Sequence, residues 1–138
     1  MFPSIRLTVA ARGLLVAVAL WCVATGVAYM PQVGATPSVL GLVYAVIPPH
    51  AWAVLWITAG VLMLAGLRWY RARQIGTSLA MGLTLLLACA YSSAWLTGDM
   101  ARGWVSAKNY ILIAAVVSLG AAVLCEGVLA GGSTRRVP

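Results

Sequence analysis

Long uncharged stretches dominate the pattern of hydrophobic and polar positions along the chain. Residues 13–67 contain no Lys, Arg, Asp or Glu, and a second uncharged stretch covers residues 74–98. A helix needs about 20 mostly apolar residues to cross the hydrocarbon core of a bilayer, so the first stretch is long enough for two crossings. Prolines disfavour one continuous helix there, because they lack an N–H donor and restrict the preceding residue; they are Pro31, Pro37, Pro48 and Pro49.

These breaks predict an all-α, polytopic membrane protein with a single membrane domain, residues 1–138. Within lipid every backbone polar group must be paired internally, which favours helices and excludes an open sheet. Four transmembrane helices are expected, joined by short connections, at about residues 7–29, 50–67, 75–96 and 109–129.

A short helix is predicted between the first and second spans, at about residues 37–47. Pro37 follows Thr36 and precedes Ser38, and proline is favoured at the first position of a helix. About ten residues rise only about 15 Å, which is too short to cross a bilayer. We therefore expect an interfacial or re-entrant helix that packs on the bundle as a lid; a functional gate is the alternative.

The composition excludes a soluble globular enzyme and a disordered chain. Of the 138 residues, 63% are hydrophobic and 8% are charged, whereas soluble domains are about half apolar and a quarter charged. The net charge of +7 would suit nucleic acid only on a soluble body with a basic face. The expected partner is therefore the lipid bilayer and not nucleic acid.

The distribution of positive charge predicts the orientation. Lys and Arg are enriched in cytoplasmic loops. With four crossings, one side carries Arg6, Arg12, Arg68, Arg71, Arg73, Arg135 and Arg136, whereas the other carries Arg102, Lys108, Asp99 and His50. Both termini are therefore expected in the cytoplasm, with the protein in the cytoplasmic (inner) membrane. A cleaved leader would leave three spans, but the apolar run 13–30 is longer than a leader's usual 7–15 residues.

Aromatic residues indicate the same boundaries, because Trp and Tyr prefer the headgroup level. Trp69 and Tyr70 map to the cytoplasmic side, and Trp21 and Trp56 lie deeper, as packing or lipid contacts. The residues expected at the outer face are Tyr29, Trp52, Trp95, Trp104 and Tyr110.

No catalytic, cofactor-binding or metal-binding residue is predicted, so we expect no enzyme and no cofactor. Cys22, Cys89 and Cys125 form no CxxC pair, and they are expected to be core residues because free cysteine packs like a small hydrophobic residue. Cys22 and Cys89 are expected at a similar depth. The single His and the two widely separated acids do not suggest a metal site.

Two acidic positions leave alternatives open. Glu126 lies near the cytoplasmic end of the fourth span, where a salt bridge to Arg12 or Arg71, or an anchor at the membrane interface, is expected; an ion or proton path is the alternative. Asp99 and Arg102 are expected to form a local ion pair worth under about 1 kcal/mol, or a site for an external partner.

Small residues four positions apart favour close helix packing in lipid. They permit a packed bundle, homo-oligomers or a membrane-protein partner. The pairs are Ala24 with Ala28, Gly76 with Ala80, Ser78 with Gly82, and Ser118 with Ala122.

Two sequence runs carry a resemblance to a known group. Residues 48–61 read PPHAWAVLWITAGV, and residues 102–106 read RGWVS. Together they resemble small four-span membrane proteins of actinobacterial phages, some encoded near endolysin genes and regarded as holins or holin-like. The resemblance implies self-association in the host membrane and permeabilisation or depolarisation at lysis. It transfers no site residue.

Two other functions remain open. One is an interaction or scaffold subunit of a membrane complex, and the other is a small transporter or channel. Small multidrug exporters of similar length carry a Glu in their first span, which this chain lacks.

Overall fold

The protein is all-α, with four long helices. A computed structural model describes residues 3–30 and 38–132, and the side chains of residues 9–30, 39–41 and 43–119. These residues contain no strand. The long helices are α1 (Pro3–Ala28), α3 (Pro49–Ala65), α4 (Tyr70–Leu96) and α5 (Gly103–Gly132); a 3₁₀ turn η1 (Ser38–Leu40) and a one-turn helix α2 (Gly41–Tyr44) lie between α1 and α3.

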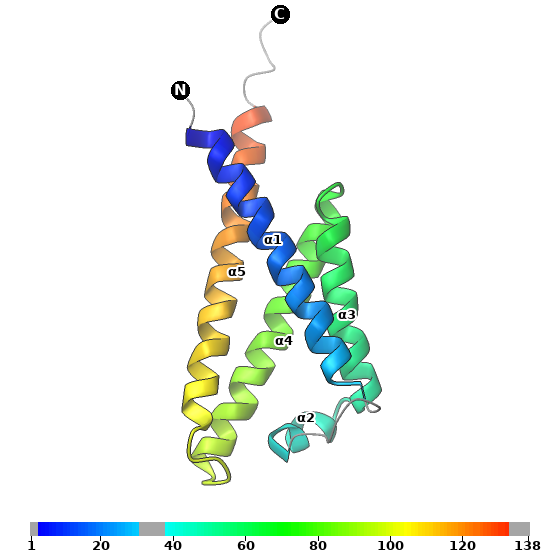
Figure 1. The fold of residues 1–138 in the computed structure, drawn as a ribbon, viewed down its shortest axis with the longest axis vertical. Helices are drawn as coiled ribbons and strands as arrows, with labels where there is room; N and C mark the ends of the chain where they lie inside the picture. Colours follow the sequence, from blue (N-terminus) through cyan, green and yellow to red (C-terminus); the bar gives the residue numbers. More distant parts are fainter. Residues whose placement is uncertain (1–2, 31–37, 133–138) are drawn as a thin grey trace, which may run out of the picture.

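The four long helices contact one another in a ring. Helix α1 packs along α3, α3 along α4, and α4 along α5, and α5 returns to α1. The start of α1, the end of α5 and the turn between α3 and α4 lie at one end of the molecule (Figure 1). We call this the termini end. The opposite end, which we call the α2 end, holds α2 and the turn between α4 and α5 (Figure 1).

Three helices begin well before the predicted spans, and the first of them, α1, begins at Pro3 rather than residue 7. Helix α4 begins at Tyr70 rather than residue 75, and α5 begins at Gly103 rather than residue 109. Arginine and lysine can extend their side chains from a helix end toward a polar layer, so charged positions do not have to lie in loops. Gly98, with a φ of 82°, allows the tight turn between α4 and α5.

The predicted short helix is replaced by less regular structure. Of the segment 37–47, residue 37 lies outside the described residues, and the rest forms η1, α2 and a turn. Leu40 is 1% exposed and belongs to the main core cluster. The segment is therefore packed onto the bundle. Pro48 then precedes α3, which has proline at its first position.

The α1–α3 interface is close because glycines lie at the contact. A Cβ at Gly60 would lie 2.6 Å from the carbonyl oxygen of Ala19, and a Cβ at Gly26 would lie 2.8 Å from that of Ala53. Both distances are shorter than atoms tolerate, so only glycine permits this approach of the two backbones.

Two described helices are long and apolar enough to cross a membrane by length and composition: α1, over Val9–Ala28, and α4. Helix α3 and the searched part of α5, Gly103–Leu119, are apolar but shorter.

One aromatic residue that was expected at the outer face packs inside the bundle. The side chain of Trp52 is 0% exposed. It packs edge-on against Trp56, with ring centroids 6.0 Å apart, and against Tyr29 at 6.4 Å. Its position at the start of α3 indicated depth along the helix but not the face on which the ring lies.

Candidate functional site

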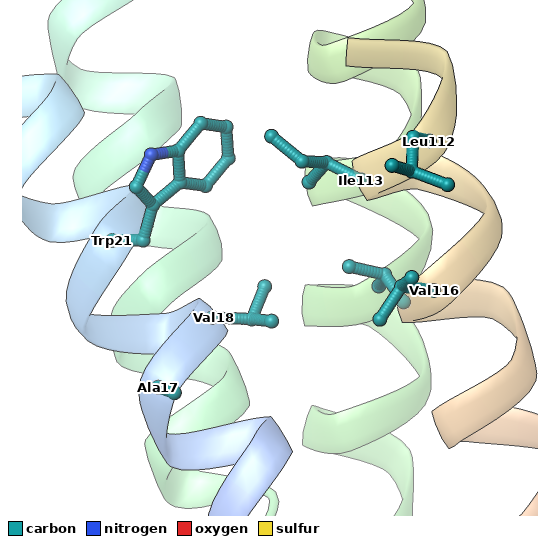
Figure 2. Close-up of a pocket in the computed structure, with 7 residues that line it drawn as sticks. Ala17, Val18, Trp21, Leu112, Ile113 and Val116 are labelled. Carbon is teal, nitrogen blue, oxygen red and sulfur yellow. The ribbon is translucent and has the colours of Figure 1, made fainter. Parts of the chain in front are cut away.

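An apolar groove between α1 and α5 is the first candidate site. Its volume is about 320 Å³, and it is lined almost entirely by apolar atoms. Val18 and Trp21 of α1 face Ile113 and Val116 of α5 across the gap (Figure 2). Ala17, Leu112 and Val117 complete the lining. The groove can accept an apolar chain or side chain, but it offers no group for acid–base or nucleophilic chemistry.

Trp21 connects this groove to the core. Its ring lies edge-on against Trp56, with centroids 5.3 Å apart, and Trp56 is fully buried. Aromatic pairs prefer such edge-to-face contacts. The indole in the groove is therefore held by the α1–α3 interface. The sequence suggested packing or lipid contact for both tryptophans, and Trp56 makes packing contacts.

Tyrosines from four elements converge at the α2 end, a cluster that sequence reasoning missed. Tyr29, which follows α1, lies within electrostatic range of Tyr44, Tyr91 and Tyr110, and all four pack against the core. Tyr91 and Tyr110 stack with centroids 5.4 Å apart. Only the shared position of these residues near predicted span ends could have indicated the cluster.

Some polar atoms in this region are buried without a partner. Among the described residues, the hydroxyl of Tyr44 and the indole nitrogens of Trp52 and Trp56 have no hydrogen-bond partner. Desolvation by burial raises the pKa of Tyr44 above its usual value. These groups can donate hydrogen bonds.

The small-residue pairs divide between the inside and the outside of the bundle. Gly76 and Ala80 are buried, and a Cβ at Gly76 would lie 2.7 Å from the backbone nitrogen of Met63. This pair therefore mediates the α3–α4 contact. The outward-facing pairs are Ala24 with Ala28 and Ser78 with Gly82.

The fourth pair lies partly outside the described side chains, which include Ser118 but not Ala122. Ser118 Oγ lies 3.2 Å from the sulfur of Met81 and donates a hydrogen bond to the carbonyl of Ala114 at 2.7 Å. Ser118 therefore contributes to the α4–α5 contact.

The turn between α4 and α5 does not form the predicted ion pair. Between the described residues Asp99 and Arg102 the structure shows no salt bridge. The Asp99 carboxylate instead accepts a hydrogen bond from the hydroxyl of Thr97 at 2.6 Å. Arg102 is exposed. The loop is thus closed by a local side-chain contact at the end of α4.

The cysteines do not share one environment. Cys22 is buried, as predicted, but Cys89 is exposed, so the prediction that it is a core residue is wrong. Cys89 lies on the outward side of α4, beside an apolar groove of about 350 Å³ that also includes Val43 and Ile47. The side chains of Cys125 and Glu126 lie outside the described residues, so the predicted Glu126 salt bridge does too.

Two buried threonines of α4 are satisfied within their own helix. Thr77 donates to the carbonyl of Arg73 at 2.8 Å, and Thr84 donates to that of Ala80 at 2.7 Å. The searched residues include no group of three or more His, Cys, Asp or Glu that could hold a metal ion.

Comparison with known proteins found no matching family model, no similar curated protein and no similar solved structure.

Proposed function

We propose that this chain is an integral protein of the cytoplasmic membrane, with four transmembrane helices and both termini in the cytoplasm. The observation that carries the proposal is the apolar exterior of the bundle. Large hydrophobic side chains face outward from the middle of every long helix, among them Leu20, Val61, Leu85 and Leu112 at 45–63% exposure. In water such a surface would be aggregation-prone, whereas in lipid it faces a matching solvent.

Helix lengths support four crossings. Helix α3 has 17 residues and α5 has 30, which correspond to rises of about 25 Å and about 45 Å. The lower limit for a transmembrane helix is about 17 residues. The turn between α3 and α4, at the termini end, carries the exposed cations Arg68 and Arg71, as expected for a cytoplasmic face.

Within this membrane setting, we propose a holin-like or lysis-accessory role that acts by self-association. The outward-facing Ser78 and Gly82 of α4 support it, because the monomer leaves this small-residue surface unused. A Cβ at Gly82 would meet no atom within 4 Å. A helix of a second copy can approach closely at such a position. Enough copies assembled in this way would open or depolarise the membrane.

Inducible expression in a bacterial host tests the role directly. Membrane potential, followed with a dye, should collapse above a threshold level of the protein. The variant Gly82→Leu should delay this collapse. Chemical cross-linking should also trap fewer dimers of this variant, although its monomer stays folded. Val61→Leu, on the outward face of α3, is the matched control and should change neither. Unchanged potential and growth at high expression of the wild-type chain would contradict the role.

The same outward faces would also serve an interaction or scaffold subunit. Extraction in mild detergent followed by mass spectrometry separates the two functions, since self-association yields homo-oligomers and a subunit retains a defined foreign partner.

A transporter or channel receives less support, because Thr77 and Thr84 are the buried polar side chains of the described spans. Substrate flux in liposomes would be its test.

A further inference from the structure

The turn between α3 and α4 concentrates positive charge. Arg68, Arg71 and Arg73 lie within six residues of sequence, and Arg68 and Arg71 are exposed while Arg73 is half-buried. The first turn of α4 contains no acidic residue, and its N-cap residue, Trp69, makes no side-chain capping hydrogen bond. The unpaired N–H groups of a helix N-terminus add further positive potential.

Arg73 is held in a defined position. Its guanidinium carbon lies 5.2 Å from the centre of the Tyr70 ring, a cation–π contact. A Cβ at Gly66 would lie 2.5 Å from the Cα of Arg73, so the α4 backbone is pressed against the end of α3. The arginine therefore has little freedom to move away from the turn.

One nitrogen of this guanidinium is left unsatisfied. The Nη2 atom of Arg73 is buried and has no hydrogen-bond partner among the described residues. A buried charged donor without a partner is costly, so the guanidinium favours an acceptor. Because Arg73 as a whole is only half-buried, that acceptor can come from outside the bundle. The chain has two acids: Asp99 follows the far end of α4, and Glu126 belongs to α5 at the termini end.

The flanking aromatic residues indicate where such an acceptor would lie. Trp69 and Tyr70 are 64% and 48% exposed, and both residue types prefer the headgroup layer of a membrane. At that level the abundant anion is the lipid phosphate, and arginine binds phosphate with two parallel hydrogen bonds. A cluster of cations favours headgroups with net negative charge over zwitterionic ones.

We infer that the α3–α4 turn binds the phosphate of an anionic phospholipid, with Arg73 as its principal ligand and Arg68 and Arg71 as supporting cations. The inference rests on the proposed insertion in the membrane. It goes beyond that proposal by assigning a specific lipid class to one end of one helix.

The full chain in nanodiscs tests the site. Wild-type protein should retain phosphatidylglycerol over phosphatidylcholine in native mass spectrometry, and phosphatidylglycerol should raise its unfolding temperature. Arg73→Gln should lower the apparent affinity for phosphatidylglycerol about tenfold, and Arg73→Lys should lower it less. Arg102→Gln, which removes an exposed cation near the α2 end, is the control and should leave the preference intact.

Several outcomes would overturn the site. They are equal retention of both lipids by the wild-type chain, equal losses from Arg73→Gln and Arg102→Gln, and the same stabilisation by inorganic phosphate alone. If Glu126→Gln and Arg73→Gln lower the unfolding temperature equally in both lipids, Arg73 is a partner of Glu126 instead. Failure of insertion is separately visible, because alkaline carbonate would then release the chain from membranes.

Discussion

Single glycine residues control how closely the helices approach. At Gly60 the missing side chain allows α3 to lie against the backbone of α1 at Ala19, and Gly76 does the same between α4 and α3. By contrast, Gly13 and Gly82 have open space around them. Glycine is thus essential at some positions and dispensable at others, although all four lie inside apolar helices.

Replacement of Gly60 by valine should destabilise the bundle. The added side chain must displace backbone atoms, and overpacking of this kind costs about 1–3 kcal/mol. Unfolding in mixed detergent micelles measures the change in the free energy of unfolding. Gly13→Ala is the matched control and should be neutral or stabilising by up to about 1 kcal/mol, because alanine is the better helix former. Equal effects of the two substitutions would argue against the α1–α3 contact.

The buried hydroxyl of Tyr44 should make stability depend on alkaline pH. Burial raises the pKa of this phenol in the folded protein above its usual 10.0. Its contribution is therefore fully present below pH 10 and is lost as the pH rises through the raised pKa. The free energy of unfolding, measured at pH 8 and pH 11, should fall less in Tyr44→Phe than in the wild type. A fall of the same size in both would show that Tyr44 is not desolvated.

At the scale of elements, the short irregular segment between α1 and α3 packs closely against the bundle. The pair η1 and α2 has only seven residues, Ser38–Leu40 and Gly41–Tyr44. Yet Leu40 is as buried as the residues of the long helices. The segment is attached to the bundle by Leu40 and by partly buried side chains that pack against the same core, namely Val39, Val43, Tyr44 and Ile47.

Removal of the Leu40 side chain should loosen the segment. Leu40→Ala should cost about 2–5 kcal/mol, the usual range for a buried leucine, and should speed hydrogen exchange over residues 38–47 before the long helices are affected. Val46→Ala, at a position that is 82% exposed, should leave exchange unchanged. Uniform acceleration across all helices would show instead that the segment unfolds only with the whole bundle.

Sequence patterns revealed the helices better than the faces they present. Proline positions and uncharged runs were sufficient to predict four long helices, because helix interruption is a local effect. The burial of Trp52 and the exposure of Cys89 depend on which neighbouring helix lies opposite, which no local pattern contains. The tyrosine cluster was missed for the same reason, since its members come from separate elements. Helices α4 and α5 begin before the predicted spans because the prediction placed charged residues in loops, whereas both helices contain such residues.

For the whole molecule, the arrangement in Figure 1 makes a strict prediction about sidedness. The ends of the chain and the α3–α4 turn lie together, and the α4–α5 turn lies at the other end with α2. If the bundle spans the membrane, these two groups must be in different compartments. An even number of crossings requires both termini to lie on the same side of the membrane.

Site-directed labelling measures this sidedness. In a chain whose native cysteines are replaced by serine, a membrane-impermeant maleimide added to intact cells should label Arg102→Cys and not Arg71→Cys. After the membrane is disrupted, both should react, since both positions are exposed. Labelling of Arg71→Cys in intact cells would invert the proposed orientation. Equal labelling of both would exclude a membrane-spanning bundle.

The edge-to-face contact of Trp21 with Trp56 gives the protein a built-in optical reporter. One indole borders the α1–α5 groove (Figure 2), while the other is sealed in the interior. The chain has six tryptophans, so with the four others replaced by phenylalanine a brominated acyl chain that entered the groove would quench the emission of this pair. Loss of that emission would report, in real time, when a lipid chain occupies the space.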